Sequence, residues 1–538
     1  MKKKFSCAKL LLFSFLGMVA IIAVWGSINF AGSGAQEGKP AIQIDSGSTV
    51  TDWPIDENGD IDFLEAMNQL RSQGITPQEN AFIPLVRAIG TDVDKRAGPI
   101  SDEFFERLGI ERLPDKGDYF VSYEQWQQER HSADEKGTGA SRIDFEKFFD
   151  HVDFALVNRW ATDEIPDLAT WLNDISVPLA VAGTATSKQK YYYPIVANQR
   201  GSLPSLISSD LRFVQIYRDL ARAFVIRANQ SLQQGDFAAW KNDVFVAYFI
   251  GAMASKGTTL VEMLVAIAID SIANRAVISA AMSGSLNAEQ LQQMQDEIAS
   301  LPRITGLVKY VKHGERLTGL DAIGAIARHG VGVMGNSSDL SYVPKFAWNA
   351  VDMNEAAKEL ARNYDKLGEL ASIDDPRKRN EAFAEWEADM GKEQANIPTE
   401  MVTSLVLGRK AKGTCMGKIL GNMLMPAMIA VDAAYSRYAS EHDMVKILLA
   451  LESYKLDNGI YPNSLDKLAP QYLAEVPVDS YSNTPFSFER SEDTSSFKLY
   501  SFGKNWVDDG GEDLKKDWPL PATKILTWRE YEQEAAKD

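Results

Sequence analysis

The run of residues 508–513, which reads DDGGED, has the composition of a cation-binding loop. Ca²⁺ is a hard cation that takes about six to eight oxygen ligands, and carboxylates separated by glycines can fold side-chain and backbone oxygens around one ion. Lys504, Lys515 and Lys516 lie close to this run and add positive charge, which favours a metal-free turn held by backbone hydrogen bonds. A calcium loop and a metal-free turn are therefore both open interpretations.

Two other glycine-containing runs depart from phosphate-binding motifs. Residues 330–335 match G-x-G-x-x-G, but they are expected to follow a long helix, whereas a dinucleotide-binding loop follows a strand and opens a helix. In residues 413–418, GTCMGK, the glycine spacing is one residue shorter than a P-loop requires. We interpret the first run as a loop and assign neither run to a nucleotide.

Nucleophiles and metal ligands elsewhere form no recognisable constellation. No G-x-S-x-G elbow is present, and Cys415 is expected in an apolar helix without a neighbouring histidine. None of the histidines has the i, i+4 spacing that aims two imidazoles at one zinc ion. The neighbourhood that comes nearest to a site contains His313, Glu315, Asp321 and His329, and charge on a helix surface accounts for it.

Aromatic clusters offer a second kind of candidate. Tyr191, Tyr192 and Tyr193 are consecutive, and Trp160 and Trp171 lie a short distance before them. Such side chains can line a groove for a sugar or a peptide, but large aromatic rings more commonly fill a core. Core packing is the interpretation that we favour.

Composition and charge set the class of protein. The chain has 538 residues, 45% apolar and 24% charged, as in ordinary globular proteins, and its length predicts several domains. A net charge of −18 repels phosphate backbones, so no nucleic acid is expected as a partner. Cys7 and Cys415 cannot build a disulfide framework or a thiolate metal site.

The N-terminal segment predicts export from the cytosol. Four lysines within the first nine residues precede an uncharged run over residues 10–35. This run is long enough to span a bilayer as a helix of about 20 residues, and its densest apolar part has signal-peptide length. We expect a signal anchor or signal peptide over residues 1–35, with residues 10–30 in the inner membrane and the bulk of the chain periplasmic. Cleavage after the small residues Ser33 and Ala35 would make the protein periplasmic or secreted.

Apolar periodicity predicts a mainly α-helical protein. Residues 36–200 are expected to form a mixed, mostly helical region, in which Thr76 and Glu79 form a capping box and residues 178–196 contain strands or extended segments. Residues 201–415 are expected to form an α-helical domain of antiparallel hairpins or a bundle. Its first helix is expected to break at Gly235-Asp236, and two more are expected over residues 237–256 and 260–282. A fourth is expected to open with a capping box of Asn287 and Gln290 and to end at Pro302. One hairpin there is somewhat similar to a tetratricopeptide hairpin, but the repeat period does not recur.

The C-terminal part, residues 416–538, predicts a small α+β domain. A helix is expected from near Met425 to Lys455, and Asn458-Gly459 can end it because this pair permits left-handed backbone. Residues 484–491 and 496–503 then alternate between apolar and polar as two paired strands do.

These phrases resemble the globular part of the major pseudopilin of type II secretion systems. In that family a long helix ends in a YKLDNxxYP phrase, a turn with Pro and Asn precedes the first strand, and an LYSxG strand leads into an acidic, glycine-rich loop that binds calcium. The match covers about a fifth of the chain. The matching residues are Tyr454–Gly459 with Tyr461 and Pro462, Val476–Asp479 with Asn483 and Pro485, Leu499–Gly503, and Asp508–Asp513.

The resemblance implies a calcium site in the acidic loop and two departures from the family. The family often has Asp where Asn505 stands, and no short leader followed by a Phe-led helix with an early glutamate precedes this module, so ordinary polymerisation into a fibre is not expected. The ligands that the resemblance implies are Asp508, Asp509 and Asp513, helped by Asn505, Ser501 and the Leu499 carbonyl.

The leading hypothesis is a non-enzymatic, membrane-anchored scaffold or interaction protein of the cell envelope. The whole chain resembles large exported proteins of planctomycete-type bacteria without an assigned activity, and stacked helical hairpins commonly bind other proteins. Its partners would be envelope or secretion-apparatus proteins. The alternative is an extracytoplasmic hydrolase that acts on polysaccharide or peptidoglycan with paired carboxylates as acid and base. A third hypothesis is a calcium-sensing envelope component.

Overall fold

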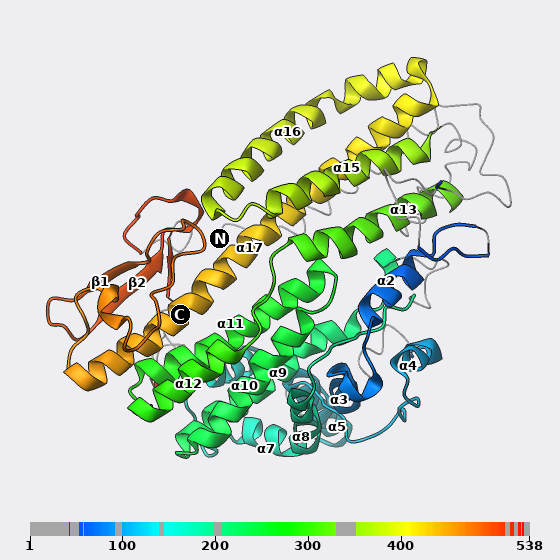
Figure 1. Cartoon of the computed structure of the whole chain (residues 1–538). Helices are drawn as coiled ribbons and strands as arrows, with labels where there is room; N and C mark the ends of the chain where they lie inside the picture. The colour runs from blue at the N-terminus through cyan, green and yellow to red at the C-terminus, as the bar shows by residue number, and fades with distance from the viewer. Residues whose placement is uncertain are drawn as a thin grey trace.

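The computed structural model describes residues 42–43, 53–57, 59–91, 99–138, 145–197, 206–329, 351–511, 517–520, 526–528 and 530–531. Within these residues the protein is mainly helical with a small antiparallel sheet near the C-terminus, which confirms the predicted fold class at this level. The helices form an elongated body, and the sheet lies at one end of it (Figure 1). The expected membrane segment and the G-x-G-x-x-G run lie outside the described residues.

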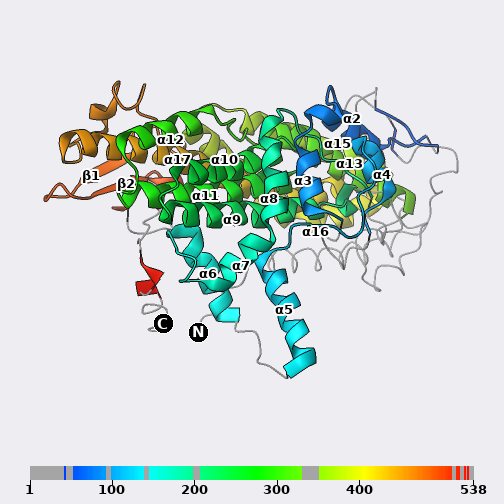
Figure 2. The ribbon, with the colours of Figure 1, turned by 90° about the horizontal axis from the view of Figure 1, so that it is seen from below.

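In the described residues before 209 the helices are short, and the group α5 to α7 projects from one side of the body (Figure 2). Their bounds are α2 (Phe63–Ser72), η1 (Pro77–Glu79), α3 (Phe82–Ile89), α4 (Asp102–Leu108), α5 (Tyr123–Thr138), α6 (Phe145–Val157), α7 (Pro166–Asp174), α8 (Ser176–Gly183), η2 (Thr184–Ser187) and η3 (Leu206–Ser208).

Two predictions in this region are corrected. Residues 178–185 are helical, in α8 and η2, because a run that is apolar on all sides does not distinguish a buried helix from a buried strand. Thr76 caps no backbone N–H; its hydroxyl donates to Glu79 Oε2 at 3.0 Å. The buried Asn80 satisfies backbone N–H groups here instead. Its side-chain oxygen accepts the N–H groups of Phe82 and Tyr192 at 3.0 and 2.9 Å.

Four helices of the central region begin and end close to their predicted positions. Their bounds are α9 (Arg212–Gln233), α10 (Phe237–Ala254), α11 (Leu260–Met282) and α12 (Ala288–Ser300). Thr259 with Glu262 forms a capping box at the start of α11, and Asn287 with Gln290 forms the predicted one at α12. Since α9 packs on α10 and α10 on α11, consecutive helices lie against each other as hairpins.

As far as the structure describes it, the second half of the helical body contains a π-helical turn and four further helices. These are η4 (Tyr310–Glu315), α13 (Arg316–His329), α15 (Met353–Ala371), α16 (Pro376–Leu407) and α17 (Arg409–Asn458). At 50 residues, α17 is about 75 Å long and runs from one end of the body to the sheet (Figure 1). It starts well before Met425 and continues through Pro426, so the boundary expected after residue 415 falls inside one helix.

Glycines let α17 approach α15 closely. A Cβ atom at Gly413 would lie 2.1 Å from the Asp352 carbonyl oxygen, and one at Gly417 would lie 2.5 Å from the Cβ of Glu359. At Gly421 it would lie 2.5 Å from an Asn363 side-chain nitrogen. The GTCMGK run is therefore part of a helix-packing face, in which the missing side chains bring two backbones together.

The sheet packs beside the last turns of α17. Gly459 ends the helix in the left-handed region at φ +75°, as predicted, and η6 (Leu465–Leu468) follows. Strands β1 (Ser487–Arg490) and β2 (Phe497–Ser501) then pair antiparallel, with Phe488 opposite Leu499, and the predicted strand pair is confirmed. The short turn η7 (Gly503–Asn505) follows β2. Strand β3 (Trp518–Pro519) pairs antiparallel with the edge of β2 that faces away from β1.

Leu526 and Trp528, which follow the sheet in sequence, contact the helical body. The backbone N–H of Leu526 donates to the side chain of Asn158 at 2.9 Å. The ring of Trp528 lies edge-on to that of Phe154 on α6, with centroids 5.0 Å apart. Residues beyond the sheet are thereby tied to α6, far from it in sequence.

Candidate functional site

The predicted ligands of the acidic loop are engaged in hydrogen bonds within the protein. Asp508 Oδ1 accepts the Tyr500 hydroxyl at 2.8 Å, and Asp509 Oδ2 accepts Asn505 Nδ2 at 2.7 Å. The buried Ser501 and Leu499 point elsewhere: the hydroxyl of Ser501 donates to Asp479, and the Leu499 carbonyl accepts the Leu520 N–H, both at 2.8 Å. Asp513 lies outside the described residues.

Asp517 belongs to the same neighbourhood, and the sequence analysis missed it. Its Oδ2 accepts the Gly511 N–H at 2.7 Å, while its buried Oδ1 has no hydrogen-bond partner among the described residues. The signal in the sequence that could have indicated it is its place four residues after the acidic run 508–513. Within the described ranges, no three His, Cys, Asp or Glu side chains form a group that could hold a metal ion. The loop thus supplies carboxylates but, as far as it is described, not a complete set of ligands.

A pocket of about 400 Å³ opens between the α5–α7 group and helices α9 and α11. Apolar and aromatic side chains form part of its lining, and Tyr123, Trp171 and Ile226 are buried there. This size suits a small organic ligand. The charged residues that line it are Glu124, Asp153, Arg218, Asp219, Arg222 and Arg275.

Opposite charges face one another in this pocket. Arg222 donates to Asp219 at 2.8 Å, and Arg218 donates to Gln215 at 2.6 Å while its buried Nε has no partner among the described residues. Burial raises the pKa of Asp219 although Arg222 opposes it. Burial also raises the pKa of Asp153, against Arg275 and Arg222. The pocket therefore combines guanidinium groups with two carboxyls whose pKa values are raised.

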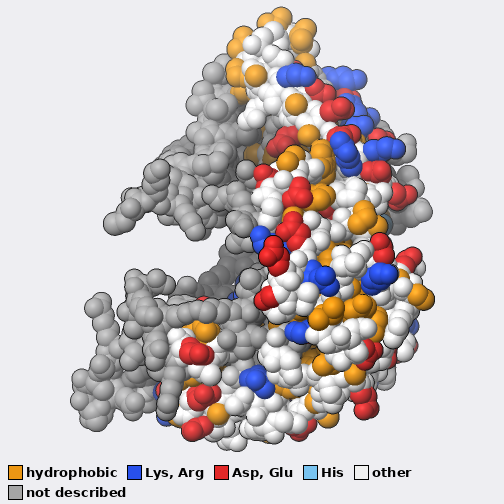
Figure 3. Space-filling model, turned by 90° about the vertical axis from the view of Figure 1, so that its left-hand side faces the viewer, with side chains coloured by type: hydrophobic (Ala, Val, Ile, Leu, Met, Phe, Trp, Pro, Cys, Tyr) orange, Lys and Arg blue, Asp and Glu red, His pale blue; other side chains and the backbone are white. Residues whose placement is uncertain are grey.

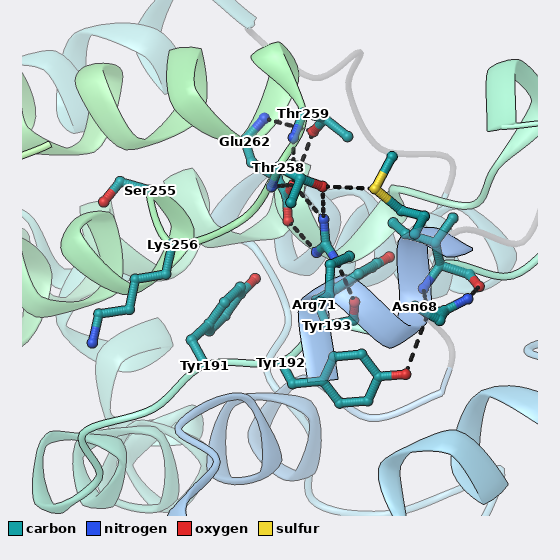
Figure 4. Close-up of polar contacts among 12 residues, drawn as sticks. Asn68, Arg71, Tyr191, Tyr192, Tyr193, Ser255, Lys256, Thr258, Thr259 and Glu262 are labelled. Carbon is teal, nitrogen blue, oxygen red and sulfur yellow. Dashed lines mark hydrogen bonds and ion pairs between the residues drawn. The ribbon is translucent and has the colours of Figure 1, made fainter. Parts of the chain in front are cut away.

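A fully buried ion pair lies in the core next to the aromatic run. Arg71 on α2 donates to both carboxylate oxygens of Glu262 on α11 at 2.6 and 2.9 Å, and to the Tyr193 carbonyl at 3.0 Å (Figure 4). The side chains are 3% and 0% exposed. Glu262 also accepts the N–H groups of Thr258 and Thr259. The cluster joins three chain segments, at residues 71, 193 and 258–262. Because both charges have partners, it presents no free reactive group.

The π-helical turn η4 lies against the same cluster. A Cβ at Gly314 would lie 1.9 Å from the Thr258 carbonyl oxygen, so the two backbones touch. Lys309 donates to the carbonyls of Ser255 and Lys256 at 3.3 and 2.7 Å, and burial lowers its pKa to about 8. π-helical turns often mark functional sites. Here, however, the ammonium of Lys309 is bonded to backbone carbonyls and does not point to a ligand site.

The other candidates from the sequence are dispersed. Tyr191–Tyr193 and Trp160 are buried in the core, and of the aromatic candidates only Trp171 lines the pocket. Glu315 accepts the Leu260 N–H at 3.1 Å and Asp321 accepts the Leu206 N–H at 2.6 Å, so they do not converge on His313. Burial raises the pKa of Cys415 to about 11, which makes it a poor nucleophile.

A polar cluster joins the helical body to the lower half of α17. Asn274 on α11 donates to Asp270 at 3.0 Å and to Glu441 on α17 at 3.3 Å. Ser271, which lines the pocket, donates to the same Glu441 oxygen at 3.1 Å. The pocket and α17 are thus connected through a single carboxylate, whose pKa burial raises.

Comparison of the chain with protein-family models, curated proteins and solved structures finds no match. Two helices in the described part, α11 and α17, are long and apolar enough to cross a membrane; 67% of the apolar window of α11 and 50% of that of α17 are buried inside the protein.

Proposed function

We propose that the protein is a membrane-anchored scaffold of the cell envelope, which displays a pseudopilin-like end on a helical body. The observation that supports this most is the continuity of α17, which belongs to both parts. It packs on α11, α12, α15 and α16 along the body, and on η6 and β2 at the terminal end. Because α17 is one continuous helix, it holds the terminal end at a fixed position relative to the helical body, as a scaffold requires.

The terminal end is held to α17 by a buried carboxylate. Asp479, 1% exposed, accepts the hydroxyls of Ser440 on α17 at 2.7 Å, Ser482 at 2.9 Å and Ser501 on β2 at 2.8 Å. The order of long helix, short turn, strand pair and acidic loop agrees with what the resemblance to the major pseudopilins implies. On that resemblance, the partners would be envelope or secretion-apparatus proteins, and calcium would order the acidic loop.

The test is partner capture from envelope membranes. Leu456 and Ile460, at the end of α17, are 53% and 43% exposed and offer apolar contact area on the terminal end. Affinity purification of the full chain, followed by mass spectrometry, should recover an envelope protein that the variant Leu456→Glu/Ile460→Glu loses. Val177→Glu on α8, where the side chain is 53% exposed, is the matched control and should keep the partner. Equal recovery by all three chains would remove the proposed role of the terminal end.

A hydrolase is the second candidate, because the pocket holds Asp153 and Asp219, both with raised pKa values. Carboxyls of this kind in a pocket are candidates for acid–base work. Tyr191–Tyr193 cannot line a substrate groove for a hydrolase, since these side chains are buried. Purified full chain would be assayed for release of soluble fragments from peptidoglycan. Activity that Asp219→Asn abolishes would favour this candidate, and inactive wild-type protein would remove it.

A further inference from the structure

The three most exposed large apolar side chains among the described residues lie within six positions of one another. They are Val402, Val406 and Leu407, which are 65%, 89% and 71% exposed. They occupy the end of α16, and Gly408, at φ +93°, then reverses the chain into α17. Figure 3 shows apolar side chains gathered at the upper end of the molecule, where α16 and α17 meet in Figure 1. We call residues 402–410 the hairpin tip.

The sequence of the hairpin tip and of the α17 turns that follow it is basic, whereas the whole chain has a net charge of −18. Residues 401–431 contain no Asp or Glu but four basic residues; of these, Lys418 pairs with Glu400 at 3.0 Å and Lys412 is buried. Arg409 and Lys410 follow the apolar side chains directly and are exposed. Lys410 is 76% exposed even though its ammonium lies 3.4 Å from Glu355. Apolar side chains that protrude beside exposed basic ones are typical of segments that dock on anionic bilayers.

The hairpin tip also lies near the first described residues of the chain, Ile42 and Gln43. The N–H of Gln43 donates to the Asn354 side chain at the start of α15 at 2.7 Å, and Ile42 is 4% exposed. Two residues before Asn354, the N–H of Asp352 donates to the Arg409 carbonyl at 3.1 Å. Only six residues separate the uncharged run, which ends at residue 35, from Ile42. They can span at most about 25 Å.

We propose that the hairpin tip docks on the anionic phospholipid surface of the membrane that holds the N-terminal run. Val406 and Leu407 enter the boundary between headgroups and acyl chains, and Arg409 and Lys410 meet lipid phosphates. The docking gives the scaffold a second attachment point, which fixes the direction of α17 relative to the bilayer. This inference rests on the proposed anchorage by residues 10–30. The bilayer is the occupant that these side chains favour, because exposed basic residues, Arg409 and Lys410, stand directly beside exposed apolar ones, as at the boundary between headgroups and acyl chains.

The test places a fluorophore at the tip in the full chain. In a Cys7→Ser/Cys415→Ala background, Val406→Cys is labelled with an environment-sensitive dye, and the protein is reconstituted into nanodiscs with or without phosphatidylglycerol. We expect a blue-shifted emission that spin-labelled lipids quench, more strongly in anionic discs. The same label at Val177→Cys on α8, where the side chain is 53% exposed, should stay in water. Arg409→Gln/Lys410→Gln should lower the ratio of docked to undocked tips about 30-fold, since each basic residue favours docking about fivefold.

Two results would overturn the proposal. A label at position 406 that stays water-exposed, although the chain sits in the discs, means that the tip does not touch lipid while the anchorage holds. A blue shift that depends on protein concentration and not on lipid charge means that the tip meets a second copy. If the chain does not enter the discs, the proposed anchorage is wrong. Sedimentation of the full chain with phosphatidylglycerol vesicles then tests separately whether the hairpin tip docks on lipid. Binding that Val406→Ser/Leu407→Ser abolishes supports docking, and absence of binding refutes it.

Discussion

Arg71 and Glu262, 191 positions apart in the sequence, form an ion pair in which the guanidinium meets both carboxylate oxygens and neither side chain is more than 3% exposed. Burial by itself would raise the pKa of Glu262, but Arg71 and the bonds from Thr259 hold it below its ordinary value of 4.5. The pair therefore stabilises the fold above pH 4.5, and this stabilisation is lost as the pH falls through the lowered pKa.

Glu262→Gln should destabilise the protein by about 3–5 kcal/mol, because it leaves the guanidinium of Arg71 buried without a counter-charge. Urea unfolding measures the change. Arg71→Met/Glu262→Leu should cost less than the sum of the single changes, since it removes both charges. Lys392→Met, which breaks a surface pair with Asp389, is the control and should have no measurable effect. An equally small effect of Glu262→Gln would contradict the role given to this pair.

Gly417→Ala should destabilise the protein by about 1–3 kcal/mol, because the new methyl group would overlap Glu359 and the Ala356 carbonyl oxygen, 2.5 and 2.7 Å away. Gly391→Ala on α16 is the matched control: a Cβ there meets nothing within 4 Å, so the change should stabilise the helix by about 0.5–1 kcal/mol. Thermal unfolding of both variants provides the comparison. Two variants of equal stability would show that α15 and α17 do not need their close approach.

Lys309 should react with acetic anhydride at a lower pH than other lysines. Burial lowers its pKa to about 8, whereas a hydrogen bond to Asp389 raises that of Lys392. Competitive labelling followed by mass spectrometry should give a midpoint near pH 8 for Lys309 and one above 10.5 for Lys392. Because the unfolded chain keeps this proton up to higher pH, Lys309 destabilises the fold least above pH 10.5 and most below pH 8. Identical midpoints would refute the prediction.

Calcium binding by the acidic loop predicts heat on titration of the full chain with Ca²⁺. Asp508→Asn/Asp509→Asn should abolish that heat, because it removes two carboxylates that bind a hard cation. Asp493→Asn is the control, since this carboxylate lies in the β1–β2 turn, where it accepts from Ser491 and Ser495. Titration without heat, or heat that the double variant retains, would leave the loop as a metal-free turn.

Features that depend on neighbours in the sequence could be predicted. The capping box at Asn287 and Gln290, the stop at Gly459 and the pairing of β1 with β2 were all predicted, because caps, left-handed glycines and alternating strands act over a few residues. The helix α8 was mistaken for extended chain, since its apolar run has no periodicity to interpret.

The sequence by itself determined that the chain is mainly helical, where the helices α9 to α12 begin and end, and that a strand pair follows the last long helix. Only the tertiary structure decided that α17 runs unbroken past Pro426, that Arg71 meets Glu262, and that the charged pocket and the hairpin tip exist. The physical reason is the distance along the sequence over which each interaction acts. Local propensities act between residues a few positions apart, whereas packing against α15 and α16, burial and exposure depend on segments that meet only when the chain folds.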